Sequence, residues 1–183
     1  MLKTIFSKRE LSEYIDYYSC VSDLLNNSEV NKLKSFRHHI FTTRFQHSLN
    51  VSYYNFRLCK LLRLDFRAAA RAGLLHDFFF YNRKEHQNKL SSHSAEHPVV
   101  ALENAVQMFS ITDLEADMIV NHMWPMTVKL PHYRETFVIT LVDKFCAVGE
   151  VGVCIGAIIA KRLRTIRSLL GTITANSGIG YMQ

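Results

Sequence analysis

The sequence predicts an all-α fold, a compact bundle of helices, and three observations support this prediction. Glycine and proline are scarce, with 7 and 3 in 183 residues, so the chain has few tight turns. Several stretches repeat apolar residues at steps of three and four, which is the spacing of one helix face. Hydrophobic residues make up 48% and charged residues 21%, the balance expected of a globular protein with a substantial core.

The helices can be placed along the chain by this periodicity. The stretch from 44 to 64 is the clearest, because Val51, Tyr54 and Leu58 recur on one face. The expected helices cover 10–26, 29–41, 44–64, 66–77, Pro98 to about Phe109, Thr112 or Asp113 to Trp124-Pro125, 133–149 and 153–170.

Helix ends and domain limits follow from local signals. Asp65 is placed to cap the helix over 66–77, and Glu115 is placed to form a capping box at the helix near Thr112. Pro98 suits the first turn of its helix. We expect a polar loop or lid over 81–96. The domain limits are then residues 1–150 for one helical domain, followed by a C-terminal helix and mobile tail over 151–183.

The charge of the chain favours an anionic partner. Lysine and arginine number 22 against 16 acidic residues, a net charge of +6. No helix-turn-helix, RNP-type or zinc-finger pattern accompanies this charge, so nucleic acid is not the expected partner. A small phosphorylated substrate, such as a nucleotide, fits the charge equally well.

Cysteine usage and hydropathy indicate a cytoplasmic protein. The four cysteines form no C-x-x-C pair and lie in apolar or helical contexts, which is typical of reduced core thiols. No signal peptide is evident. The longest apolar run, Val151 to Ala160, is too short to span a bilayer, so no membrane association is expected.

Several metal-ligand side chains fall where core-facing helix stripes end. His47, His122 and Asp143 each continue such a stripe, and the pair His76-Asp77 ends another helix. An unpaired buried polar group costs roughly 2–7 kcal/mol, a cost that a shared cation removes. Each of these residues taken alone is more often a satisfied core residue than a ligand. Their conjunction favours a metal site.

The order of these residues resembles the HD-domain superfamily of metal-dependent phosphohydrolases. The segments that carry the resemblance are Gln46-His47-Ser48-Leu49-Asn50-Val51, Gly73-Leu74-Leu75-His76-Asp77 and Leu141-Val142-Asp143-Lys144, and the similarity covers roughly residues 40–150. It implies a compact HD-type bundle of helices around a buried metal site.

The resemblance also implies the ligands. His47, His76, Asp77 and Asp143 would hold one metal ion. In the dinuclear branch of the superfamily a second ion is held by the motif aspartate and two further histidines, here Asp77, His97 and His122. Some dinuclear relatives have a His-His pair where this chain has His122-Met123.

By the same resemblance the expected activity is hydrolysis of a phosphoester in a nucleotide or another small phosphorylated metabolite. A metal-activated hydroxide would attack phosphorus, with Asp77 and His76 as catalytic residues. The mixed N/O ligand set suits one or two ions of Fe, Mn, Co or Zn. The alternative is a non-catalytic HD-fold module that binds a nucleotide or metal and regulates a partner.

Substrate phosphate needs cationic donors in addition to a metal. Arg44 lies one turn before His47, and a guanidinium binds phosphate in a bidentate way. Arg83, Lys84 and Lys129 lie in nearby loops and are further candidates, with solvated surface charges as the alternative for all four.

The other histidines match no motif position and are mostly expected at the surface. They are His38, His39, His86, His93 and His132, of which His86 and His93 could touch substrate. The hypothesis as a whole requires His47 and Asp143 to lie within about 10 Å of the His76-Asp77 pair, since metal–ligand bonds are roughly 2 Å long.

Overall fold

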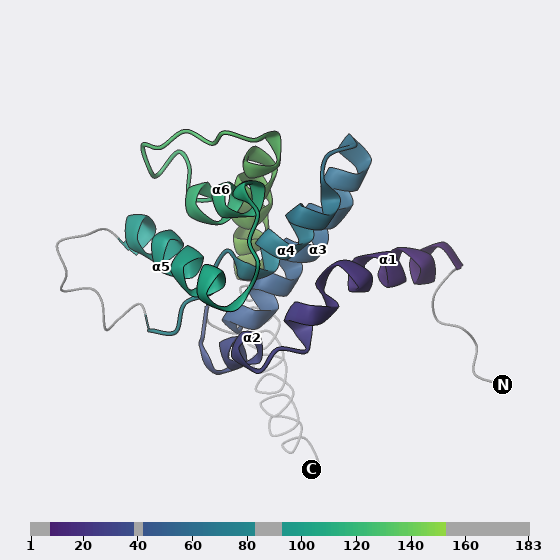
Figure 1. The fold of residues 1–183 in the computed structure, drawn as a ribbon, viewed down its shortest axis with the longest axis horizontal. Coiled ribbons are helices and arrows are strands. Elements are labelled where there is room, and N and C mark those ends of the chain that lie inside the picture. The colour runs from purple at the N-terminus through teal and green to yellow at the C-terminus, as the bar shows by residue number, and fades with distance from the viewer. Residues whose placement is uncertain (1–7, 39–41, 83–92, 153–183) are drawn as a thin grey trace, which may run out of the picture.

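The computed structural model describes residues 8–38, 42–82 and 93–152, and these form helices without a β-sheet (Figure 1). The all-α prediction is therefore confirmed. The elements are α1 (Lys8–Leu25), α2 (Ser28–Lys32), the short 3-10 helix η1 (Leu33–Ser35), α3 (Arg44–Leu62), α4 (Phe66–Leu75), α5 (His93–Met108) and α6 (Asp113–Asn121). A further helix begins at residue 134 and is helical through residue 152, where the described part of the chain ends.

α4 is the centre of the bundle and packs against α1, α3, α5 and α6. In Figure 1 the α3–α4 pair separates α1 from α5. The small residues of α4, namely Ala68, Ala69, Ala70, Ala72 and Gly73, are buried, and Gly73 has a particular role. A Cβ atom at this position would lie 2.7 Å from the Cα of Ser52 on α3. The approach of α3 to α4 therefore requires glycine at residue 73.

Two of the predicted helix caps are present. The Asp65 side chain accepts hydrogen bonds from the backbone N–H groups of Arg67 and Ala68. Thr112 and Glu115 form a reciprocal capping box at the start of α6. These caps satisfy backbone donors that have no partner within the helix.

The helix predicted over 29–41 is wrong in length. In its place are α2 and η1, which end at Ser35. After Ser35, Arg37 and Thr43 form an isolated antiparallel bridge. The reason is competition for backbone groups. The Phe36 carbonyl accepts from the Arg44 N–H at 2.8 Å. It is therefore engaged with the start of α3 instead of with a continuing helix.

The start of α5 also differs from the prediction. The helix begins at His93, inside the segment expected to be a polar loop, and Pro98 lies in its second turn. Proline removes only the hydrogen bond from position 98 to the Ser94 carbonyl, a limited loss this close to a helix start. Smaller differences occur at the helix predicted over 66–77, which ends at Leu75, and at the helix predicted over 133–149, which covers 134–152.

Other expectations concern the C-terminal segment. The helix predicted over 153–170 and the tail from Thr172 to Gln183 lie outside the described residues. Within the described residues no helix is long and apolar enough to cross a membrane. Cys20, Cys59 and Cys146 are buried free thiols, as expected, whereas Cys154 lies outside the described part.

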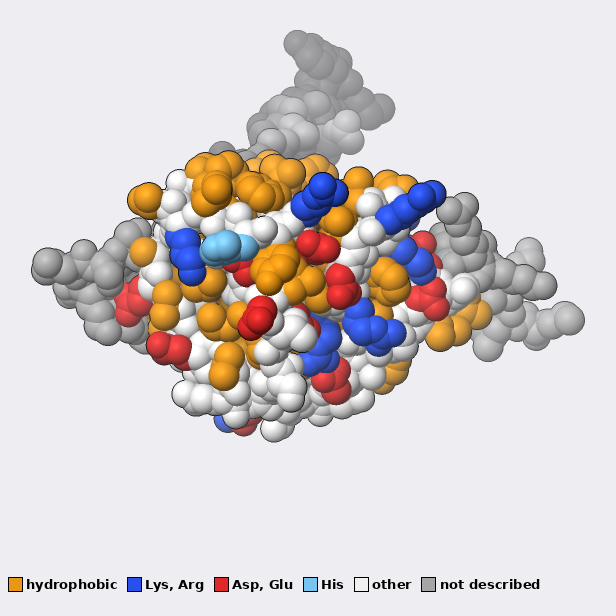
Figure 2. Space-filling view, turned by 45° about the horizontal axis from the view of Figure 1, so that its top comes forward, with side chains coloured by type: hydrophobic (Ala, Val, Ile, Leu, Met, Phe, Trp, Pro, Cys, Tyr) orange, Lys and Arg blue, Asp and Glu red, His pale blue; other side chains and the backbone are white. Residues whose placement is uncertain are grey.

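The molecular face drawn in Figure 2 carries lysine and arginine side chains interspersed with acidic ones and with hydrophobic patches. On this face the positive excess of the chain does not gather into one continuous basic surface. This face therefore lacks the broad basic surface with which proteins bind a nucleic-acid backbone.

Asp117 ties α6 to the beginning of the helix over 134–152. Its buried carboxylate accepts hydrogen bonds from Asn121 Nδ2 at 2.7 Å, Thr136 Oγ1 at 2.5 Å and the His132 backbone N–H at 3.1 Å. Burial raises the pKa of Asp117, but these hydrogen bonds outweigh burial and lower it below its usual value. The network fixes how the end of α6 faces the helix that follows it.

We predict that Asp117→Asn lowers the free energy of unfolding by about 2–4 kcal/mol at neutral pH, because buried donors lose a charged acceptor. The pKa of Asp117 is lower in the folded state. The stability that ionised Asp117 contributes is therefore fully present above a pH of about 4. It is lost as the pH falls through the lowered pKa. Urea unfolding across this pH range measures the effect.

The matched control is Asp16→Asn, because Asp16 forms a half-exposed pair with Lys60 at 2.7 Å. Exposed pairs contribute about 0–1 kcal/mol, so this variant should remain near the wild type. Equal effects of the two substitutions would contradict a special role for Asp117.

Candidate metal centre

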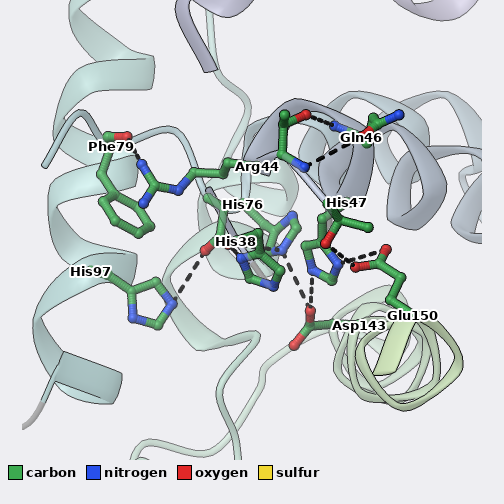
Figure 3. Close-up of polar contacts among 12 residues, drawn as sticks. His38, Arg44, Gln46, His47, His76, Phe79, His97, Asp143 and Glu150 are labelled. Atoms are coloured by element: carbon green, nitrogen blue, oxygen red, sulfur yellow. Dashed lines mark hydrogen bonds and ion pairs between the residues drawn. The ribbon is translucent and has the colours of Figure 1, made fainter. Parts of the chain in front are cut away.

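His47 lies in the first turn of α3, directly after a capping box formed by Thr43 and Gln46. Its ring is fully buried, and Nε2 lies 2.9 Å from Asp143 Oδ1 on the helix over 134–152. Nδ1 lies 3.2 Å from Glu150 Oε1, two turns further along that helix (Figure 3). A carboxylate on one ring nitrogen of a histidine fixes the ring and directs the other nitrogen, as in carboxylate–histidine–metal arrangements.

His76 is the C-cap residue of α4, so it comes to the site at the end of the central helix. Its Nδ1 donates to the Gly73 carbonyl at 2.9 Å, because a carbonyl can only accept. Nε2 is therefore the ring nitrogen that faces the cluster. This atom is buried, has no hydrogen-bond partner and lies 3.5 Å from Asp143 Oδ1. A buried acceptor without a donor is costly unless a cation reaches it.

His97 on α5 and His122 at the C-cap of α6 repeat this pattern. Their Nδ1 atoms donate to the carbonyls of His93 at 2.7 Å and Ile119 at 2.8 Å, so each Nε2 carries a lone pair. The two Nε2 atoms lie only 3.1 Å apart in the buried interior. Two facing lone pairs at that distance repel each other unless a proton or a metal ion lies between or beside them.

Asp77 divides its two carboxylate oxygens between opposite sides of the cluster. Oδ1 lies 3.4 Å from His97 Nε2, whereas Oδ2 lies 3.5 Å from His38 Nδ1 and 3.9 Å from His76 Nε2. Two ligand atoms about 2.1 Å from one ion are about 3.4 Å apart when their bond angle is tetrahedral. The separations around Asp77 are of that size, and its two oxygens face different histidines.

The histidines and aspartates of the cluster, most of them buried, form three overlapping groups that could each hold a metal ion. Within each group, one ligand atom from every residue lies within 4.8 Å of the others. The groups are His38, His47 and Asp77; His47, His76 and Asp143; and His76, Asp77 and His122. Each group shares a residue with each other group, so the donors form one continuous cluster.

The pKa shifts place protons on His47 and leave the carboxylates ionised. Burial raises the pKa of Asp77 and of Asp143, but the surrounding histidines outweigh burial and hold both pKa values well below the usual range. Burial lowers the pKa of His47, but hydrogen bonds to Asp143 and Glu150 raise it to about 10. Burial and the neighbouring His76 lower the pKa of His122 to about 3. An ion entering here would displace protons from the cluster.

The structure brings together every residue that the sequence predicted as a metal ligand, namely His47, His76, Asp77, His97, His122 and Asp143. The distances joining His47 and His76 to Asp143 satisfy the 10 Å requirement by a wide margin. Their role as ligands stays a prediction, as do the catalytic roles of Asp77 and His76.

Arg44, predicted to bind substrate phosphate, is buried and engaged with the backbone. Its guanidinium donates to the carbonyls of Phe79 at 2.5 Å and Tyr81 at 3.2 Å and stacks on the Phe79 ring, 3.6 Å from the centroid. These contacts join the start of α3 to the segment that follows Asp77. Arg44 also lines the cavity at the cluster, so phosphate binding by Arg44 stays a prediction.

Of the other predicted phosphate donors, the structure describes only Lys129. Arg83 and Lys84 lie outside the described part of the chain, as do His39 and His86. Lys129 is exposed in the loop after α6 and does not line the cavity at the cluster.

Two residues of the cluster were not predicted. His38, expected at the surface, is 22% exposed at its side chain and stacks on His47 with ring centroids 3.9 Å apart. No pattern in the sequence singles it out. Glu150 had a signal, because it follows Asp143 by seven residues and therefore lies on the same face of one helix.

A cavity of about 220 Å³ opens onto the cluster. Asp77, His97 and Asp143 line it, together with the apolar side chains of Phe79 and Met126. A larger cavity of about 960 Å³ lies between residues of α1, α3 and the helix over 134–152, with no histidine among its lining residues. The smaller cavity is therefore the candidate substrate site.

Comparison of the chain with protein-family models, with curated proteins and with solved structures found no match. The HD-domain resemblance accordingly rests on the motif residues themselves.

We predict that Glu150→Ala weakens binding of a divalent ion about 10–100-fold, because His47 loses the carboxylate that orients it. Competition with a chelator measures this affinity. The matched control is Glu13→Ala, since the Glu13 carboxylate pairs with Arg57 away from the cluster. Unchanged affinity in Glu150→Ala would rule out an orienting role.

We predict that His122→Ala loses one ion preferentially, so that the metal content per chain falls by about half, as expected for a two-metal site. Elemental analysis of the reconstituted protein measures the content, with exposed His132 replaced by glutamine as control. Unchanged stoichiometry would argue for a single ion.

Proposed function

We propose that this chain is a metal-dependent phosphohydrolase of the HD-domain type, acting on a nucleotide or another small phosphorylated metabolite. The observation that carries the proposal is the meeting of the motif residues His47, His76, Asp77 and Asp143 in one buried cluster beside a cavity. These residues come from three separate helix ends or faces, so their order in the sequence alone does not bring them together.

The donor atoms fit a divalent ion. The unpartnered Nε2 of His76 and the facing Nε2 atoms of His97 and His122 need a positive charge between them. Imidazole nitrogens and carboxylate oxygens together suit Fe, Mn, Co or Zn. His47, His76, Asp77 and Asp143 would hold one ion, and Asp77, His97 and His122 a second.

Ions bound there would supply acidity to a water molecule and offset the negative charge of phosphoryl oxygens. Asp77 and Asp143 would remain ionised, because the surrounding histidines hold their pKa values well below the usual range. The two ionised carboxylates, which line the cavity, would hold the ions and would orient a water molecule by accepting its hydrogen bonds.

The cavity walls suit a phosphorylated organic molecule. Arg37 lines the cavity and offers an exposed guanidinium to a phosphate, with the bidentate geometry that such groups share. Phe79, Met123 and Met126 supply apolar wall, which fits the organic part of the substrate. The cavity therefore offers one part of its wall to a phosphate and another part to an organic group.

The competing hypothesis is a regulatory module that binds a metal or nucleotide without turnover. The same cluster could bind a metal or nucleotide in such a module, so binding alone does not separate the two hypotheses. Turnover separates the two, because only the phosphohydrolase consumes its ligand.

We predict that the purified protein, reconstituted with Mn, Fe, Co or Zn, hydrolyses at least one member of a panel of nucleotides and phosphoesters. Asp77→Ala should lose both metal and activity while keeping most of its helicity, because Asp77 contacts both sides of the cluster. Released phosphate, metal content and far-UV circular dichroism are the measurements.

The control is Asp16→Ala, which removes a half-exposed carboxylate far from the cluster and should keep full activity. Full activity in Asp77→Ala would remove that residue from the site. Metal or nucleotide binding with no turnover on the whole panel would favour the regulatory module.

A further inference from the structure

His38 is brought to the cluster by the short segment that precedes α3. Arg37 and Thr43 form an antiparallel bridge, and the His38 N–H donates to the Thr42 carbonyl at 3.0 Å. These contacts fold the segment against the N-terminus of α3, where His47 lies in the first turn. The position of His38 is therefore set by backbone pairing, independently of the HD-type motif residues.

Two contacts define the imidazole of His38 within the cluster. Its Nδ1 lies 3.5 Å from Asp77 Oδ2, and its ring is nearly parallel to that of His47, with an interplanar angle of 18°. Figure 3 shows His38 among His47, His76 and Asp143, on the side of the cluster away from Glu150. His38 also lines the cavity.

The distance to Asp77 matches shared coordination better than a direct hydrogen bond. N–H···O hydrogen bonds cluster near 2.9–3.0 Å, whereas two ligand atoms about 2.1 Å from one ion lie roughly 3.0–3.6 Å apart at bond angles of about 90–120°. The separation of His38 Nδ1 from Asp77 Oδ2 is of the second kind, like that of His76 Nε2 from Asp143 Oδ1. His38, His47 and Asp77 moreover place one ligand atom each within 4.8 Å of the others.

We propose that His38 is a further protein ligand of the ion bound on the Oδ2 side of Asp77, in addition to the four motif residues. This inference rests on the proposed metal centre. It assigns that ion five protein residues and links it directly to the segment that carries Arg37, which lines the cavity. An ion bound there would hold this part of the cavity wall against the cluster.

The test compares His38→Ala and His38→Phe with the wild type, using Co(II) and Zn(II) as probes. Phenylalanine preserves a flat ring to stack on His47 but has no ligand nitrogen. If His38 is a ligand, both variants bind one equivalent of ion at least about 10-fold more weakly. The visible absorption of bound Co(II) also changes, because the coordination number falls.

The control is His132→Gln, whose side chain is 67% exposed and lies outside the cluster. Far-UV circular dichroism of the metal-free proteins checks that all variants are folded. If His38→Phe keeps wild-type affinity and an unchanged Co(II) spectrum, His38 is a stacking residue and the inference is overturned. Failure of the wild type to bind any ion overturns the proposed metal centre as well, whereas binding and turnover without an effect of His38 overturn this inference alone.

Discussion

The crowding of imidazole and carboxylate groups in the interior is the constraint on which the rest of the structure depends. Three histidines direct their Nε2 atoms inward, because their Nδ1 atoms donate to carbonyls of their own helices. Two ionised carboxylates lie among them. Such an assembly is stable in a dry interior only when protons or a cation neutralise it. The helices around it are arranged so that these donors meet in spite of that cost.

The helix ends contribute to this arrangement as much as the side chains. His76 and His122 are the C-cap residues of α4 and α6, so the negative ends of two helix dipoles point toward the cluster. A cation is favoured at such ends. The close approach of α3 to α4 at Gly73 places His47 beside the end of α4, which is why packing in the core and geometry at the cluster depend on one another.

Much of this arrangement could be predicted from the sequence, because periodicity identifies helices and marks which residues face inward. His47, His122 and Asp143 were identified in this way, the His76-Asp77 pair was identified at a helix end, and the family resemblance added His97. His38 could not be predicted. It is positioned by a backbone bridge between Arg37 and Thr43, an isolated short-range pairing that leaves no periodic trace in the sequence. The sequence did not predict that α5 begins at His93, because proline is most common in the first turn of a helix and Pro98 was therefore placed there.

Residues proposed as ligands meet in one place although as many as 96 positions separate them, as His47 and Asp143 show. An ion held there would act as a reversible crosslink between α3, the end of α4 and the helix over 134–152. Because the unfolded chain does not present these donors together, free ion would stabilise the native state by mass action. The resistance of the protein to heat and to proteases would then follow the concentration of available metal, so that starvation for the ion shortens the lifetime of the protein itself.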